Sequence, residues 1–115
     1  MNSVRSLVNE LEYLRQMELV DSIQLIDYGK YTLKARIFIY SDLFIQVYRN
    51  DKFNTTNFAL ILGNQRIYGR DELGGEWHRH PFDAPNTHDC SQEGQQSVTL
   101  LEFWEEVEQI IEDNF

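Results

Sequence analysis

The sequence has few of the residues that build covalent cross-links or membrane-embedded structure. It contains one cysteine, Cys90, and two prolines in 115 residues. A lone cysteine cannot form an internal disulfide, which is typical of proteins from a reducing cytoplasm. No apolar run approaches the roughly 20 residues of a membrane span, and the first residues lack the basic and then apolar pattern of a secretory signal. We therefore expect a cytoplasmic protein without membrane contact.

The last third of the chain lacks positive charge. Residues 1–79 carry ten Lys/Arg and ten Asp/Glu, and no Lys or Arg follows Arg79, whereas nine Asp or Glu do. The net charge of −9 therefore belongs to residues 80–115, mostly to the final predicted helix. The negative potential that acts on a basic partner or a competing nucleic acid would come from that helix rather than from residues 1–79. The alternative is a solvated acidic face without a partner.

The chain also lacks the short motifs that identify common enzyme classes. There is no phosphate-cradling glycine-rich loop, no Cys-x-x-Cys pair and no Gly-x-Ser-x-Gly elbow,. No cofactor is implied. At 115 residues, 42% of them hydrophobic, the chain is long enough for one core and too short for two, so residues 1–115 are predicted to form a single domain.

Hydrophobic periodicity predicts an α+β fold. Apolar residues from Val4 to Leu14 recur every three or four positions behind a Ser3 cap, which predicts a helix ending near Met17. The period then changes to two, and the predicted strands are 22–28, 31–39, 43–49, 56–62 and 66–70, with the histidine segment as a further short one,. A capping box at Thr99 opens the last helix. Short links predict sequential antiparallel neighbours. We expect a curved antiparallel sheet of four to six strands, with the N-terminal and C-terminal helices on one face.

The polar side of the strand alternation carries cations and tyrosines. On simple alternation these residues share the wet face of the sheet and form one patch: Lys34, Arg36, Gln46, Tyr48, Arg66, Tyr68 and Arg70,. Arginine binds phosphate in a bidentate fork, and a tyrosine ring can stack on a base. Gly69 would let another group approach the backbone there. The alternative is an ordinary solvent face, because exposed strand positions often carry these residues.

All three histidines lie within eleven positions, at 78, 80 and 88. His78 and His80 should point to one face of an extended segment, with Trp77 and Arg79 on the other. Imidazole titrates near neutrality and can act as a general base or acid. Cleavage of RNA by its own 2′-hydroxyl needs such a base, an acid and nearby cations, and needs no metal.

Two other roles for this segment remain open. His78 and His80 could bind a divalent metal together with a loop residue, which would be His88, Asp83 or Asp89. A histidine could instead hydrogen-bond to the Asp-rich loop and hold it in place. Cys90 lies beside acids that would raise its thiol pKa, so we regard it as incidental.

Three segments resemble the TumE-like family of prokaryotic toxin–antitoxin modules. They are Arg66-Ile67-Tyr68-Gly69-Arg70-Asp71, the segment Trp77-His78-Arg79-His80-Pro81 with His88 after it, and the helix from Leu101 to Ile111. The resemblance runs from about Phe44 to the C-terminus. It implies a toxin partnered by an antitoxin protein encoded nearby. It supplies no set of catalytic residues to assign to this sequence. The acidic helix would then dock a basic segment of the antitoxin or serve a homodimer.

Two hypotheses follow. In the first, the protein is a toxin acting on RNA as a metal-independent ribonuclease. Its predicted catalytic residues are His78, His80, Tyr68 and Arg70, and its predicted substrate-binding residues are Arg36, Tyr48, Arg66 and Arg79. In the second, the protein is a non-enzymatic interaction module and the histidine segment is structural.

Overall fold

A computed structural model describes residues 1–115 as two helices and six strands. In chain order the elements are α1 (Val4–Leu14), β1 (Ser22–Tyr28), β2 (Thr32–Tyr40), β3 (Leu43–Asn50), β4 (Thr55–Leu62), β5 (Gln65–Leu73), β6 (Glu76–His80) and α2 (Leu100–Asn114). The predicted elements are all present, and the histidine segment is the sixth strand.

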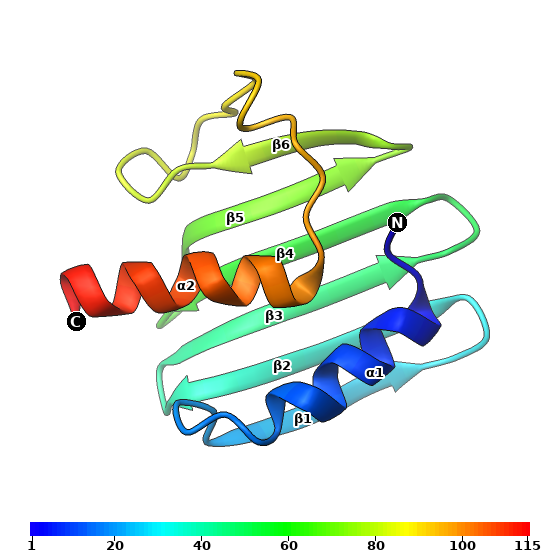
Figure 1. Ribbon diagram of the computed structural model, residues 1–115, viewed down its shortest axis with the longest axis horizontal. Helices are drawn as coiled ribbons and strands as arrows, with labels where there is room; N and C mark the ends of the chain where they lie inside the picture. Colours follow the sequence, from blue (N-terminus) through cyan, green and yellow to red (C-terminus); the bar gives the residue numbers. More distant parts are fainter.

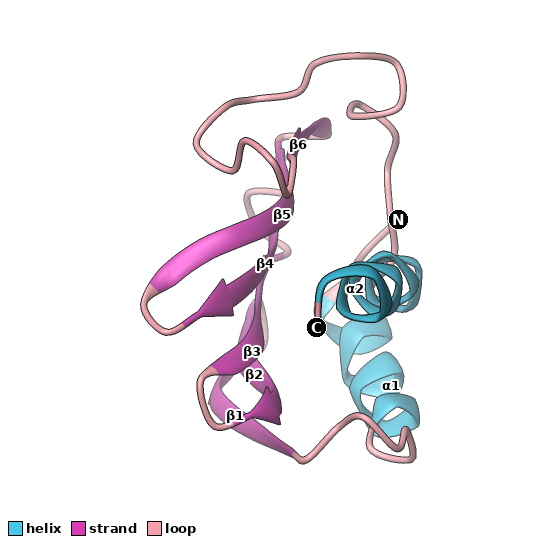
Figure 2. Ribbon diagram, turned by 90° about the vertical axis from the view of Figure 1, so that its left-hand side faces the viewer, coloured by secondary structure: helices cyan, strands magenta, loops and turns pink.

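The strands form one antiparallel sheet in the order β1-β2-β3-β4-β5-β6. Each strand lies beside its neighbour in the sequence because the connections are short hairpins. Both helices lie on the same face of the sheet, and the opposite face carries no helix (Figures 1 and 2). The predicted α+β architecture is therefore confirmed. No helix is long and apolar enough to traverse a bilayer.

The core lies between the sheet and the two helices. The helix-facing side chains of β2, β3 and β4, among them Ile37, Ile45 and Phe58, are fully buried against Leu7 of α1 and Phe103 of α2. Each helix begins with a capping box, at Ser3 and at Thr99, which pairs backbone donors of its first turn,. The sheet is therefore one-sided, with an apolar face under the helices and a polar face open to water.

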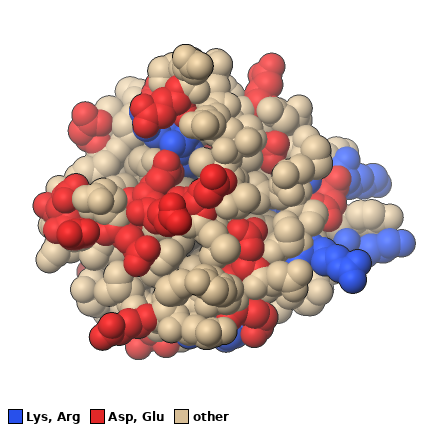
Figure 3. Space-filling view, in the orientation of Figure 1, with Lys and Arg blue, Asp and Glu red and all other residues tan.

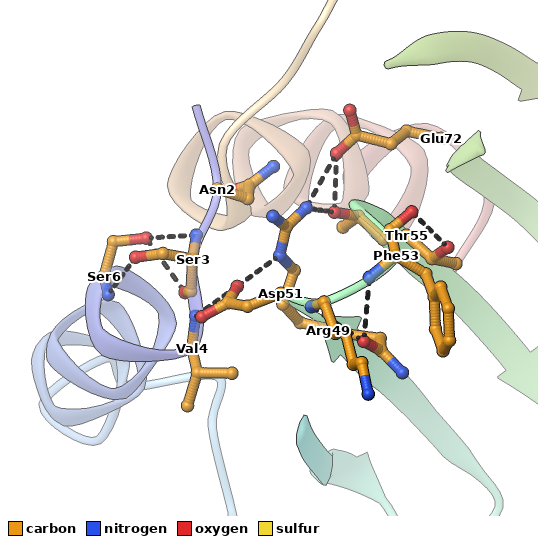
Figure 4. Close-up of polar contacts among 12 residues, drawn as sticks. Asn2, Ser3, Val4, Ser6, Arg49, Asp51, Phe53, Thr55 and Glu72 are labelled. Carbon is orange, nitrogen blue, oxygen red and sulfur yellow. Dashed lines mark hydrogen bonds and ion pairs between the residues drawn. The ribbon is translucent and has the colours of Figure 1, made fainter. Parts of the chain in front are cut away.

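A buried polar cluster fixes the N-terminus of α1 to the helix-facing side of the sheet (Figure 4). The guanidinium of Arg49 donates to Asp51, to Thr56 and to Glu72, at 2.8, 2.9 and 3.1 Å. The carboxylate of Asp51 in turn accepts the backbone N–H of Val4. Arg49 and Glu72 are almost fully buried, so this cluster belongs to the interior and is separate from the open face.

One irregularity decides which face the residues of β5 occupy. Pairing between β4 and β5 shifts after Leu60–Tyr68 to Ile61–Arg66, so Ile67 is an extra residue, a β-bulge,. The bulge reverses the alternation: Arg66 stays on the open face, whereas Tyr68 turns to the helices. The ring of Tyr68 stacks on Phe103 of α2, with centroids 5.7 Å apart.

Candidate active site on the outer face of the sheet

The face opposite the helices, here called the outer face, presents ordered rows of polar side chains. Strand register places Lys34, Tyr48, Asn57, Asp71 and His78 in one row that crosses β2 to β6. The next row contains Arg36, Gln46, Ala59, Gly69 and His80. Each of these two rows therefore begins with a cation on β2 and ends with a histidine on β6.

The cations of the two faces differ in their partners. On the helix-facing side, Arg49, Arg70 and Arg79 are all ion-paired with carboxylates. On the outer face, Lys34, Arg36 and Arg66 take part in no ion pair. The Nε groups of Arg36 and Arg66 are buried and have no hydrogen-bond partner. The outer-face cations are therefore the ones with unused capacity for a phosphate.

Tyr68 and Arg70 are not part of this face, and the expectation that they share a patch with Arg66 is wrong because of the bulge. The hydroxyl of Tyr68 donates to Glu106 of α2 at 2.8 Å. Arg70, 2% exposed, makes two hydrogen bonds to the Glu106 carboxylate and one to the carbonyl of Glu93. Together they fasten α2 and the loop to β5.

Arg79 points away from the histidines, as the alternation of β6 predicts. Its guanidinium is paired with Asp89 and Glu93 of the loop that follows. Burial alone would lower the pKa of Arg79, but the hydrogen bond and charge of Asp89 raise it. Backbone bonds between Arg79 and Asp89 also cover the free edge of β6. The Arg79 guanidinium, which the sequence predicts to bind substrate, is therefore occupied by carboxylates of the loop.

Two histidines lie beside the Asp71 carboxylate and the third lies beside both of them, and we call His78, His80, His88 and Asp71 the histidine cluster. His80 Nε2 lies 3.0 Å from Asp71 Oδ2, and His78 Nδ1 lies 3.8 Å from Asp71 Oδ1. The His88 ring centroid is 5.5 Å from that of His78 and 4.6 Å from that of His80. The expectation that His78 and His80 share a face is confirmed.

His80 is held between two acceptors. Its Nδ1 lies 3.2 Å from the carbonyl oxygen of Pro85, and its Nε2 faces the Asp71 carboxylate. The ring is 3% exposed. With both nitrogens engaged and almost no exposure, His80 is suited to positioning Asp71 and the loop, and poorly suited to exchanging protons with a substrate.

His78 and His88 have the freedom that His80 lacks. Both line a shallow groove of about 300 Å³ on the outer face, bordered also by Thr55, Asn57 and Asp71. The side chain of His78 is 31% exposed and His88 is exposed. Nδ1 of His78 lies 3.8 Å from Asp71 Oδ1, within ion-pair distance but too far for a hydrogen bond,, so a small movement of the ring would let Nδ1 donate to Asp71 and leave Nε2 as an acceptor.

Arg66 reaches this cluster because Gly69 has no side chain. A methyl group at Gly69 would lie 3.3 Å from Cδ of Arg66, 3.1 Å from the carbonyl oxygen of Phe58 and 3.8 Å from Cβ of His80. The Arg66 chain thus crosses the backbone of β5 beside His80, and its Nη2 points at the Pro85 carbonyl at 3.5 Å. The close approach expected at Gly69 is made by Arg66.

The metal alternative gains no support from this geometry. No group of three or more His, Cys, Asp or Glu side chains is arranged to hold a metal ion. Asp71, the carboxylate nearest the histidines, already accepts from His80, and Asp89 is paired with Arg79. The pKa of Asp89 lies at about 2, lowered by hydrogen bonds from Ser91 and then by Arg79. Cys90 is a free, exposed thiol outside the histidine cluster.

Asp71 is the site residue that sequence reasoning missed, although a signal was present. Gly74 and Gly75, both with positive φ, form the two-residue turn between β5 and β6. A two-residue hairpin fixes the register of its strands. Counting outward from the glycines puts Asp71 opposite His78, which is the pairing observed.

Acidic side chains cluster on the other side of the molecule. Figure 3, in the orientation of Figure 1, shows them crowded over α2 on the helix-bearing face. The sheet and its core therefore lie between this acidic surface and the outer face.

A scan against protein-family models, a search of curated proteins and a search of solved structures each find no match.

Proposed function

We propose that the protein is an RNA-cleaving toxin of a toxin–antitoxin module, acting as a metal-independent ribonuclease at the histidine cluster. The observation that carries the proposal is that two accessible histidines, His78 and His88, line one groove on the face that also carries Arg36 and Arg66, two arginines without acidic partners. General acid–base chemistry needs two titratable groups within reach of one phosphate, and cations to stabilise the phosphorane. The outer face supplies both.

The chemistry follows from the orientation of each group. Nε2 of His78 takes the proton of a ribose 2′-hydroxyl, and the 2′-oxygen attacks the adjacent phosphorus. The bond from phosphorus to the 5′-oxygen breaks, and protonated His88 gives that oxygen a proton. The products are a 2′,3′-cyclic phosphate and a free 5′-hydroxyl. Arg66, crossing Gly69 beside the cluster, stabilises the developing charge, while Asp71 and His80 position His78 and the loop,.

The toxin part of the proposal is supported by the TumE-like resemblance and by the acidic surface of α2. That surface suits a basic segment of an antitoxin encoded nearby, and it lies on the opposite side of the sheet from the outer face,. Inducible expression should slow growth, and coexpression of the neighbouring gene should restore it.

The decisive test is the double variant His78→Ala/His88→Ala, which keeps His80 and its loop contacts. Purified wild-type protein should cleave single-stranded RNA in the presence of EDTA and leave 2′,3′-cyclic phosphate ends. Each single variant should lose about 10²- to 10⁴-fold in kcat, the usual contribution of a general acid or base. Undiminished cleavage or toxicity in the double variant, with its melting temperature unchanged, would show that these histidines are not the catalysts.

The second candidate function is a non-enzymatic interaction module. It is favoured by one specific observation, the burial of His80 between Asp71 and the Pro85 carbonyl, which ties the loop to the sheet. In that case the His78→Ala/His80→Ala variant would have a lower melting temperature than wild type, and neither wild type nor this variant would cleave RNA. The thermal and cleavage measurements on the two double variants separate the candidates.

A further inference from the structure

The outer face has unused binding groups well beyond the groove. Buried donors in folded proteins almost always have a hydrogen-bond partner, so an unpartnered one calls for an explanation. Two such donors, Nε of Arg36 on β2 and Nε of Arg66 on β5, belong to this one face. An anion that crosses β2 to β5 would give both of them an acceptor.

Aromatic rings lie between these cations. Phe38 and Phe44 are half-buried neighbours with centroids 5.3 Å apart, and the Arg36 guanidinium lies 5.3 Å from the Phe44 centroid. Tyr48 stands between Lys34 and Asn57 in the row that leads to His78. Cations alternating with partly exposed rings are the composition of a surface that holds unpaired bases and their phosphates.

The rows also set a direction and a length. From β2 to β6 there are four interstrand steps, a span of about 19 Å at the usual strand spacing. Four-stranded sheets that bind single-stranded RNA across their strands stack about two or three bases. A duplex, whose bases are paired and hidden, could not place rings on Phe44 or Tyr48.

We propose, on the basis of the function proposed above, that the substrate is single-stranded RNA lying perpendicular to the strands. Its reacting phosphate lies at His78 and His88, and about three flanking nucleotides extend over β5 to β2. Arg66 and Arg36 bind phosphates, and Tyr48 and the Phe38–Phe44 pair stack bases.

Binding is tested without cleavage by using an eight-nucleotide strand with 2′-O-methyl riboses, whose 2′-oxygens cannot attack. Fluorescence anisotropy should give roughly 10-fold weaker binding for Arg36→Ala and for Tyr48→Ala, in line with losses on removing a stacking or phosphate contact. The matched controls are Arg5→Ala and Tyr13→Ala on α1, both exposed on the helix-bearing side, and they should bind like wild type. The same sequence as a duplex should bind at least 10-fold more weakly.

Salt dependence provides a second readout. With three outer-face cations neutralising phosphates, the slope of log K against log salt should be about −2, and Arg36→Ala should reduce its magnitude by about 0.7. Equal affinity for the duplex, or Arg36→Ala and Tyr48→Ala proteins that bind like wild type, would overturn the proposed track.

Cleavage kinetics separate this inference from the function on which it rests. Arg36→Ala should raise KM for an eight-nucleotide RNA several-fold more than it raises KM for a dinucleotide, because a dinucleotide does not reach β2. An equal effect on both substrates would refute the track while leaving the ribonuclease intact. Track binding without any cleavage would instead refute the ribonuclease.

Discussion

Replacing Glu106 by alanine tests whether Tyr68 and Arg70 serve stability rather than chemistry. The Glu106 carboxylate accepts three hydrogen bonds from β5: one from Tyr68 at 2.8 Å, and two from Arg70 at 3.1 and 2.6 Å. Burial alone would lower the pKa of Arg70, but the hydrogen bond and charge of Glu106 raise it. Without Glu106 the buried guanidinium keeps only the Glu93 carbonyl as acceptor.

The expected loss follows from this exposure. Removing one partner of a buried ion pair costs about 3–5 kcal/mol. The Glu106 side chain is 29% exposed, so water replaces part of the lost interaction and we expect the lower end, about 3 kcal/mol. For a domain of this size that corresponds to a fall in Tm of roughly 10 °C.

Urea denaturation followed by circular dichroism measures the change, with Glu108→Ala as the matched control. Glu108 is exposed on the same helix and also carries one charge, so its removal should change stability by less than ~0.5 kcal/mol. The Tyr68→Phe protein should unfold about 1 kcal/mol more easily and cleave RNA at the wild-type rate. A stable Tyr68→Phe protein with a 100-fold loss of cleavage would refute our placement of Tyr68 outside the active site.

Three further outcomes are expected. Burial and then Glu106 raise the pKa of Tyr68 to about 12. Because this folded-state pKa exceeds the unfolded value, the stability that Tyr68 contributes is complete below pH 10 and is lost as the pH rises to about 12. Urea denaturation at a series of pH values, compared with Tyr68→Phe, measures that loss. Asp71→Asn should reduce cleavage about 10- to 100-fold and should also lower Tm, because the amide has one acceptor oxygen and cannot serve both His78 and His80,. Gly69→Ala should cost about 1–3 kcal/mol by overpacking and weaken RNA binding by displacing Arg66, as anisotropy would show.

The arrangement of the fold was predictable because local signals agree with one another. Helical spacing from Val4 to Leu14, the capping box at Thr99 and period-two strands joined by short turns all specify a meander with one apolar face. The face carrying the helices follows from where the apolar residues fall. These signals depend only on neighbours in the sequence, which is why they suffice for the elements and their order.

The site was harder to predict because its faces depend on a single extra residue. Reading Arg66, Tyr68 and Arg70 as one alternating set requires a regular strand, and the bulge at Ile67 breaks that regularity. No residue close to Ile67 in the sequence indicates a bulge at this position. What favours the bulge is distant: Tyr68 gains a stacked partner in Phe103 and a hydrogen bond to Glu106. Long-range packing of this kind is not visible in a strand pattern.

The same bulge places Arg70 and Arg66 on opposite faces of the sheet, where they have different electrostatic roles. By turning Arg70 inward to meet Glu106, it neutralises a charge beneath the acidic helix, and by keeping Arg66 outward it leaves a cation near His78. The acidic surface of α2 lies on the helix-bearing side, so the sheet and its core separate it from the outer face. A net charge of −9 argues against RNA only if the charge is treated as uniform, whereas the surplus of acidic residues follows Arg79 and lies mostly on α2.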